Sequence, residues 1–148
     1  MEEMKKMTEN NQTNNTAVPD MKLELVPVPV SDIDRAKAFY VEKIGFNADH
    51  DVQPGNGMRV LQLTPPGSAC SIVIGAGLGE ISEIKPGSIK GLHLVVTNIV
   101  EAREALLGRG VEVGQVQDMG GILFARFADP DGNSWLLQEI PITFKKKI

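Results

Sequence analysis

The first part of the chain alternates apolar and polar residues in one stretch and spaces them helically in the next. Leu23 to Val30 alternates and is rich in valine, which predicts a β-strand. Ser31 follows at the position expected for a helix N-cap, and Gly45 stands where a helix would end. Between them, apolar residues recur at helical spacing and predict a helix: Ile33, Ala36, Phe39, Tyr40 and Ile44.

Three short β-runs follow this helix and are separated by turn sequences. The turns are Pro54-Gly55-Asn56-Gly57 and Pro65-Pro66-Gly67, whose residue types favour tight reversals. Pro27 and Pro29 lack the backbone N–H that a central strand needs, so the strand that contains them is predicted at a sheet edge. The three further strands are predicted at 46–53, 58–64 and 70–75.

The second half repeats this pattern about 65 residues later. Ser31-Asp32-Ile33 returns as Thr97-Asn98-Ile99, an offset of 97 − 31 = 66 residues. Such a repeat indicates two copies of one supersecondary unit. The fold class is therefore predicted as α+β, with two tandem βαβββ modules that form a cleft between curved mixed sheets. The second copy is predicted as a strand at 91–97, a helix at 99–109 and strands at 111–117, 122–128 and 134–140.

These elements divide the chain into five segments of one domain. The glycine-rich linker leaves two arrangements open, since the modules could pair within one chain or be exchanged between two chains. The predicted segments are a disordered tail at 1–20, the first module at 21–75, the linker at 76–90, the second module at 91–140 and a C-terminal tail at 141–148.

Composition narrows the classes of partner. Of the 148 residues, 42% are hydrophobic and 23% charged, as in soluble globular proteins, and no apolar run is long enough to span a membrane. The net charge of −4 without a basic stripe argues against nucleic acid. Because there is one cysteine and the N-terminal residues do not resemble a signal peptide, we expect a cytoplasmic protein.

Motifs in both modules resemble those of a known superfamily. They are VPVSDIDRAKAFYVEKIGF, RVLQLTPPGSACSIVIG, GLHLVVTNIVEAREALLGRGVEV and FADPDGNSWLLQEI. Together they resemble the vicinal oxygen chelate superfamily, which includes glyoxalase I, extradiol dioxygenases, fosfomycin-resistance enzymes and bleomycin-resistance proteins. The resemblance covers residues 22 to 140 and implies a site between the two modules.

The resemblance also implies where a divalent metal would be held. The family's ligand positions correspond to Leu25, Ser71, Gly91 and Leu136 in this sequence, and none of these is His, Glu or Asp. A divalent cation needs three or four nitrogen or oxygen ligands, so no metal site and no cofactor is expected here. A divalent metal is not excluded, because neighbouring side chains could be recruited.

The polar candidates lie near these positions. His93 shares a strand face with Gly91. Two interpretations stay open: it orients a ligand or acts as an acid or base, or it is a core histidine that is hydrogen-bonded to a backbone carbonyl. Arg59 could clamp an anionic substituent, or be an exposed edge arginine. The predicted ligand-binding residues are Leu25, Pro27, Arg59, Ser71, Gly91, His93, Leu136 and Gln138.

Two function classes follow from this set. The first is a metal-free protein resembling the bleomycin-resistance branch, which binds a small organic molecule in the cleft between the modules. The alternative is an enzyme of the superfamily, a lyase or isomerase of the glyoxalase or epimerase type, or a dioxygenase, that depends on metal or uses His93. A homodimer is expected in either case, because edge strands leave backbone groups that need partners.

Overall fold

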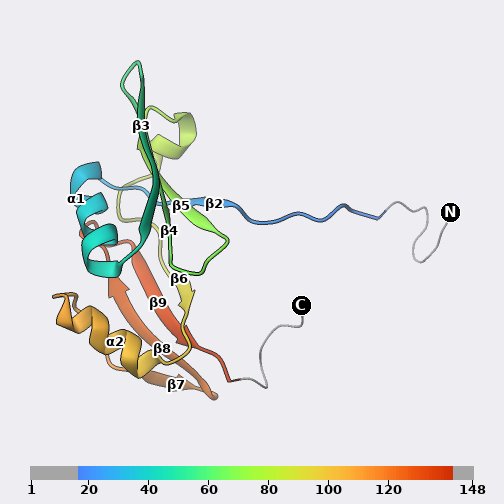
Figure 1. Ribbon diagram of the computed structural model, residues 1–148, viewed down its shortest axis with the longest axis vertical. Coiled ribbons are helices and arrows are strands. Elements are labelled where there is room, and N and C mark those ends of the chain that lie inside the picture. Colours follow the sequence, from blue (N-terminus) through green and yellow to red (C-terminus); the bar gives the residue numbers. More distant parts are fainter. Residues whose placement is uncertain (1–16, 142–148) are drawn as a thin grey trace.

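The computed structural model describes residues 17–141 and contains two four-stranded sheets (Figure 1). In the first sheet the strand order is β2-β5-β4-β3, with β2 parallel to β5 and the other pairs antiparallel. The strand that contains Pro27 therefore lies at the edge, as predicted. The strands of this first sheet are β2 (Leu25–Pro27), β3 (Asn47–Gly55), β4 (Met58–Thr64) and β5 (Ser71–Ala76).

The second sheet repeats the first. Its order is β6-β9-β8-β7, again with one parallel pair at the edge and antiparallel pairs elsewhere. Each sheet follows the element order strand, helix and three strands, which confirms the predicted α+β class and the two βαβββ modules. The strands are β6 (Leu92–Val95), β7 (Gln117–Met119), β8 (Ile122–Ala128) and β9 (Ser134–Glu139).

The first helical segment begins one residue later than predicted. Asp32, and not Ser31, is the N-cap: its side chain accepts a hydrogen bond from the backbone N of Arg35 (3.1 Å). Ser31 instead donates its hydroxyl to Asp131 in the second module (2.6 Å). The segment comprises α1 (Ile33–Ala38) and the π-helix η1 (Phe39–Ile44), and it ends at Gly45, whose φ of 90° favours glycine.

The second helix, α2 (Ile99–Gly108), is capped by Asn98. The strand predicted at 111–117 is absent, because only its last residue belongs to β7 and 111–116 form no strand. Val113 is still buried, and its carbonyl oxygen accepts a hydrogen bond from the Arg103 guanidinium. Arg103 also donates to the carbonyl oxygen of Gly114 (2.7 Å). Side-chain hydrogen bonds from α2 thus hold this segment where a sheet ladder was expected.

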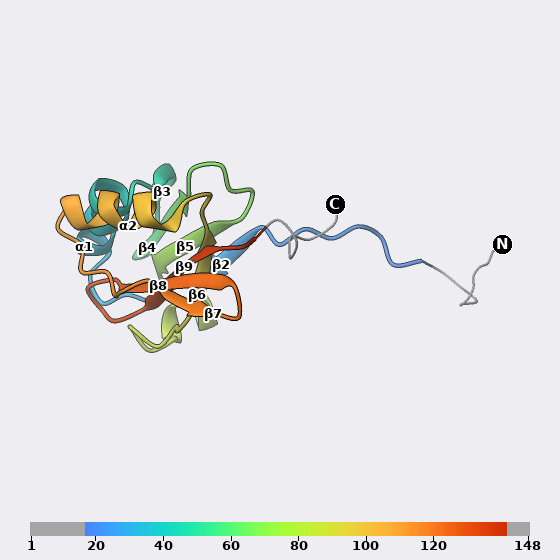
Figure 2. The same ribbon diagram turned by 90° about the horizontal axis from the view of Figure 1, so that it is seen from below.

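The connections and the tails also have local structure. The segment expected to be a linker contains the 3-10 helix η2 (Gly79–Glu83). Of the predicted N-terminal tail, residues 1–16 lie outside the described part, and 17–20 are exposed. Residues 17–24 form an extended arm that leaves the body on the side opposite the helices (Figures 1 and 2). Of the C-terminal tail, 142–148 lie outside the described residues.

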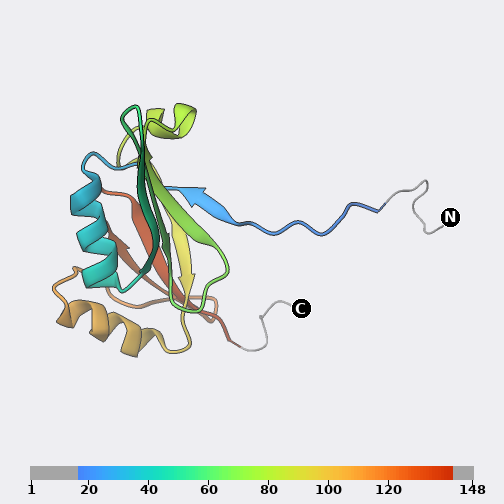
Figure 3. The same cartoon turned by 45° about the horizontal axis from the view of Figure 1, so that its top comes forward.

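One hydrophobic core joins both modules. Tyr40 of η1 stacks on Phe46, with ring centroids 5.5 Å apart, and meets Trp135 of β9 edge-on at 5.8 Å. Phe39 lies 6.5 Å from Phe127 of β8. Figure 3 shows α1 and α2 on one side of the molecule. The core therefore lies between the helices and the helix-side faces of the two sheets, and the other face of each sheet is directed away from it.

Candidate functional site

Three predicted ligand-binding residues are neighbours on the outer face of the first sheet, the face that is directed away from the core. Leu25 of β2 pairs in register with Ser71 of β5, and Pro27 pairs with Val73. Register partners share a sheet face. The Ser71 hydroxyl is buried and lies 2.6 Å from the hydroxyl of Thr64, while Leu25 is 36% exposed. This group offers an apolar surface with one satisfied hydroxyl.

Four other predicted residues gather on the outer face of the second sheet. His93 of β6 pairs with Leu136 of β9, with Gly91 two residues before His93 on the same face. Gln138 lies one pair further along, between Val95 and Phe124. The side chains of His93 and Phe124 meet edge to face, with ring centroids 5.8 Å apart. The sheet thus brings together an imidazole, a phenyl ring, an amide and leucine.

His93 is exposed, so it is not a histidine of the core. Its Nδ1 lies 2.6 Å from the carbonyl oxygen of Gly91. A carbonyl oxygen only accepts hydrogen bonds, so Nδ1 carries the proton and, in the neutral ring, Nε2 is left as an acceptor. The strand and the Phe124 contact fix the direction of the ring. This arrangement can accept a hydrogen bond from a ligand laid on the sheet.

The prediction that Arg59 faces the cleft is wrong. Arg59 shares a face of β4 with Leu61, which belongs to the core, and that face is on the helix side. The guanidinium donates to both carboxylate oxygens of Asp51 (3.0 and 2.9 Å) and to Asp34 of α1 (2.8 Å). Hydrogen bonds from Arg59 and from Lys37 hold the pKa of Asp51 well below its usual range. Arg59 therefore fastens the helix to the sheet and is occupied.

The two groups of site residues are not joined within the chain. Among residues 17–141, no hydrogen bond or ion pair links the first-sheet group to the second-sheet group. Both groups lie on faces directed away from the shared core. Neither of the two cavities described below is lined by any of the predicted site residues. A single chain thus presents two separate groups of predicted site residues, which are called half-sites below.

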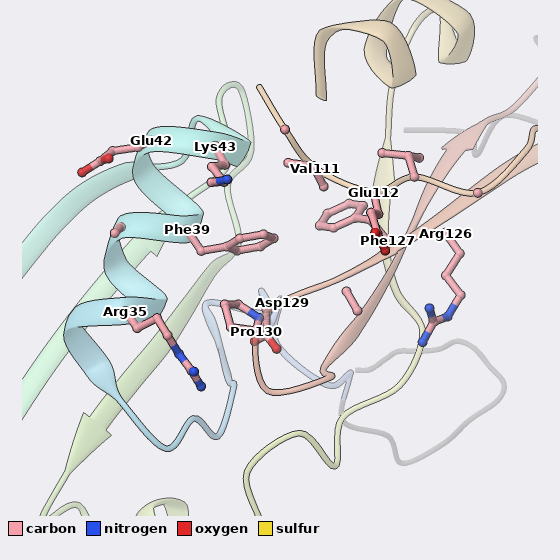
Figure 4. A pocket seen from close by; sticks show the side chains of 15 residues that line it. Arg35, Phe39, Glu42, Lys43, Val111, Glu112, Arg126, Phe127, Asp129 and Pro130 are labelled. Atoms are coloured by element: carbon pink, nitrogen blue, oxygen red, sulfur yellow. The ribbon is translucent and has the colours of Figure 1, made fainter. Parts of the chain in front are cut away.

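The larger cavity lies elsewhere, between the first helical segment and the second module (Figure 4). It has a volume of ≈ 790 Å³ and is lined by Phe39, Lys43 and Phe127, among others. It opens where 110–114 run beside β8 with one ladder hydrogen bond, from Gly114 N to Arg126 O (2.8 Å). The segment at 111–114, which forms no strand, lines this cavity, so the strand predicted there did not reveal it. A smaller cavity of ≈ 60 Å³ lies beside η2.

A buried polar network crosses the junction of the modules and was also missed. The Tyr40 hydroxyl donates to Asp129 Oδ2 (2.8 Å) and accepts from Trp135 Nε1 (2.9 Å). The same carboxylate accepts from the Asn133 amide (2.8 Å), which also donates to the carbonyl oxygen of Pro29 (2.8 Å). Burial, and then the Asp129 charge, raise the pKa of Tyr40 far above its usual value. Only the Asp-Pro-Asp-Gly turn signalled this network in the sequence.

The residues at the expected ligand positions do not fit a divalent metal. Leu25 and Leu136 have no donor atom, and Gly91 has no side chain. The Ser71 hydroxyl is already hydrogen-bonded to Thr64. Among residues 17–141, no three His, Cys, Asp or Glu side chains lie close enough together to hold a metal ion. Among the predicted site residues, His93 is the only one whose side chain is a strong metal donor.

Comparison with known proteins identifies the family. A model of the Glyoxalase/Bleomycin resistance protein/Dioxygenase superfamily matches residues 22–137. The chain belongs to this superfamily. The match spans both modules, so the repeat seen in the sequence is the repeat of the superfamily fold. No helix of the described superfamily domain has the length and apolar character needed to cross a membrane.

Members of the superfamily with similar sequence cover nearly the same part of the chain. The uncharacterized protein YetH of Bacillus subtilis (strain 168) is 32% identical over 122 residues, which are 77% of this chain and 94% of YetH. TnmS3, an antibiotic binding protein from Streptomyces sp. CB03234, is 35% identical with a TM-score of 0.74, over 84% of this chain and 100% of TnmS3. A glyoxalase/bleomycin resistance protein from the same Streptomyces is 38% identical with a TM-score of 0.67, over 78% of this chain and 98% of that protein.

Proposed function

We propose that this protein binds a small, flat organic molecule without a metal. The observation that carries the proposal is the replacement of every expected metal ligand by Leu25, Ser71, Gly91 or Leu136 in an otherwise intact fold. A mostly apolar surface with few polar groups is typical of small-molecule sites. The similarity to the antibiotic binding protein TnmS3 supports the same class of ligand.

The second sheet suggests the chemistry of the ligand. The edge of the His93–Phe124 pair and the Leu136 side chain offer contacts to a planar ring. Nε2 of His93 accepts a hydrogen bond, and the Gln138 amide both donates and accepts. A polycyclic or conjugated molecule with hydroxyl and carbonyl substituents satisfies these groups. Ser71, Leu25 and Pro27 would cover its other face.

The proposal includes a homodimer, because the two half-sites lie on sheet faces directed away from the core that joins them. A second copy of the chain would lay its second-sheet group over the first-sheet group of the first copy. Two equivalent sites would then form in one dimer, as two-fold symmetry requires. The proposal keeps the two modules of each chain paired through their shared core and places the ligand sites between chains.

Acid–base catalysis by His93 has less support than binding. Its Nδ1 is beside a backbone carbonyl oxygen, whereas a catalytic histidine is usually oriented by a carboxylate. The low net charge of −4 and the lack of basic stripes support a ligand other than nucleic acid. We also propose a cytoplasmic location, which the single cysteine, Cys70, supports.

A thermal-shift screen of the chelator-treated protein against flat aromatic compounds tests the proposal. A compound that binds the native state raises the melting temperature by mass action. Leu136→Arg should abolish the shift, since it places a charge in the middle of the apolar surface. Ala38→Trp, which obstructs the ≈ 790 Å³ cavity beside α1, is the matched control and should keep it. A shift that Ala38→Trp removes and Leu136→Arg retains would move the ligand to that cavity and refute the proposed site.

A further inference from the structure

Arg126 is the one arginine of the chain whose guanidinium has no partner within the described residues. Arg35 and Arg59 pair with carboxylates. Arg103 and Arg109 donate to backbone carbonyl oxygens. Arg126, on β8, is exposed, and its side chain makes no hydrogen bond or ion pair in the part of the chain that the structure describes, although a guanidinium carries five N–H donors. This group is therefore free to bind a molecule from outside the chain.

Arg126 lies on the outer face of the second sheet, in one row with two predicted site residues. It pairs in register with Leu136 of β9, which pairs in turn with His93 of β6. Register partners share a sheet face, so the three side chains stand side by side. The backbone of Arg126 borders the ≈ 790 Å³ cavity, where its carbonyl oxygen accepts a hydrogen bond from Gly114 N. Phe127 points into that cavity, and the Arg126 side chain stands on the opposite side of the strand (Figure 4).

Among the strands that the structure describes, no carboxylate shares this face with Arg126. The two acidic residues of the second sheet, Asp118 and Glu139, both pair with Leu123, which packs against the core, so they lie on the helix side. Each of them accepts a hydrogen bond from a backbone N–H. Apart from His93, the other strand residues of the outer face are neutral: Val95, Gln117, Met119, Ile122, Phe124, Ala128, Ser134, Leu136 and Gln138. Arg126 is thus a single cation on a neutral surface.

A neutral flat molecule on this face would leave the guanidinium covered and unpaired. Burial of a charge without a counter-charge is costly, because the group loses its hydration and gains no partner. A carboxylate removes this cost and matches the guanidinium, since its two oxygens accept two parallel N–H bonds. An aromatic carboxylate extends from the edge of its ring, so it reaches the guanidinium while the ring stays flat on the sheet.

The position of His93 sets the other end of the molecule. His93 and Arg126 are two strands apart, which is about 10 Å between strand axes. Leu136 lies between them, and Phe124 is the next outer residue of β8. Nε2 of His93 accepts a hydrogen bond, which a hydroxyl group supplies. Two fused rings with a carboxylate at one end and a hydroxyl at the other would span this row.

We infer that Arg126 binds a carboxylate of the ligand, which makes flat aromatic hydroxy acids the class of molecule that this site takes. The inference rests on the proposed function, because it places the ligand on the second sheet. It narrows the ligand from flat organic molecules in general to anions. Arg59, the arginine expected to clamp an anionic substituent, is occupied by Asp51 and Asp34. Arg126 takes that role from the second module.

A carboxylate of a second copy is the competing partner for Arg126. Asp49 borders the first-sheet half-site, because it accepts a hydrogen bond from the Thr64 hydroxyl, which lies beside Ser71. Asp49 also accepts a hydrogen bond from the Asn47 amide (2.7 Å). Its carboxylate is thus engaged within its own chain, whereas the Arg126 guanidinium is not. This difference favours an anion that the ligand supplies.

Isomeric hydroxynaphthoic acids, each paired with its carboxamide, test the inference by calorimetric titration of the chelator-treated full chain at neutral pH. The carboxamide has nearly the shape of the carboxylate but no charge. At least one acid should bind the unmodified chain about tenfold tighter than its carboxamide, as hydrogen bonds to a charged group predict. Arg126→Gln should remove that preference and leave the affinity for the carboxamide unchanged.

Arg109→Gln is the matched control, because it removes the same charge from another exposed arginine, at the end of α2, and should keep the preference. Ala38→Trp should also keep it, since this substitution obstructs only the ≈ 790 Å³ cavity. The Arg126 side chain holds no other described residue, so Arg126→Gln should melt at the same temperature as the unmodified chain when no ligand is present.

Equal affinities for every acid and its carboxamide would overturn the inference and leave the proposed function intact. A preference that survives Arg126→Gln, or that disappears in Arg109→Gln, would also overturn it. Tighter binding of the acids by Asp49→Asn would assign Arg126 to the carboxylate of a second copy instead. If no naphthalene probe binds while a neutral compound of the thermal-shift screen does, the inference alone fails. If no compound binds at all, the proposed function fails with it.

Discussion

Replacing Tyr40 by phenylalanine removes one hydroxyl from the centre of the network that joins the modules. The ring itself packs against Phe46 and Trp135 and stays in place, because phenylalanine has nearly the same shape. The side chain is fully buried, so water cannot replace the lost hydroxyl. The substitution therefore isolates the contribution of the two hydrogen bonds to the free energy of unfolding.

The expected loss is about 3 kcal/mol. The bond from the Tyr40 hydroxyl to the Asp129 carboxylate contributes about 1.5–3 kcal/mol, as a hydrogen bond to a charged group. The indole N–H of Trp135 is left without its acceptor, at a cost of about 1–3 kcal/mol. Asp129 still accepts hydrogen bonds from three donors, two backbone amides and the Asn133 side chain, so its charge is not left unpaired. The expected loss is therefore near the lower end of the sum of these two contributions. For a domain whose total stability is about 5–15 kcal/mol, this loss is large.

Urea unfolding measures the effect. Far-UV circular dichroism is used instead of fluorescence, because Trp135 is the single tryptophan and the substitution itself alters its fluorescence. The midpoint should fall with an unchanged slope. Trp135→Phe and the double variant complete a double-mutant cycle, in which removal of the orphaned N–H recovers about 1–2 kcal/mol. A loss below about 0.5 kcal/mol for Tyr40→Phe, or strict additivity in the cycle, would refute the assigned network.

Four further predictions concern stability. Arg59→Met should lower the free energy of unfolding by about 1 kcal/mol, as measured by urea unfolding. Ligand affinity, measured by calorimetry, should not change; weaker binding would show that Arg59 contributes to the ligand site. The pKa of Asp51 is lowered on folding, so the stability that this carboxylate contributes is present above pH 3.8 and is lost as the pH falls below it. The difference in the free energy of unfolding between the unmodified chain and Asp51→Asn should therefore shrink in acid. Since the pKa of Tyr40 is raised, its contribution is present below pH 10 and is lost above it, and tyrosinate absorbance should appear only as the chain unfolds. Gly87→Ala should lower the melting temperature more than Gly79→Ala. Both glycines have positive φ, but a Cβ at Gly87 would clash with the backbone oxygen of Asp131 in the β8–β9 turn, whereas a Cβ at Gly79 would meet open space. Equal losses would exclude the clash.

The fold was accessible to sequence reasoning wherever a repeat and strong turns coincide. The strands predicted at 58–64 and 122–128 have those bounds in the structure, because Gly-containing turns fix one end and alternation fixes the rest. The N-cap was placed one residue early because Ser31 and Asp32 are both good caps; the competing bond from Ser31 to Asp131 depends on the tertiary fold. Because Ser31 and Asp131 are far apart in the sequence, no local sequence pattern predicts the hydrogen bond between them.

The candidate site was accessible only in part. Periodicity correctly groups Arg59 with Leu61, but the same periodicity puts both on the helix side, because Leu61 belongs to the core. The segment at 111–116 alternates like a strand, and its Val111 and Val113 are indeed buried. Its pairing is nonetheless replaced by hydrogen bonds from the Arg103 side chain, which no local pattern encodes. Packing between distant segments decides these two cases.

Calorimetric titration of the chelator-treated protein with the strongest compound from the thermal-shift screen tests the central claim most directly. The account predicts saturable binding of one molecule per chain without added metal, and loss of that binding in Leu136→Arg. Binding that occurs only after a divalent metal ion is restored, or that Leu136→Arg leaves intact, would contradict it.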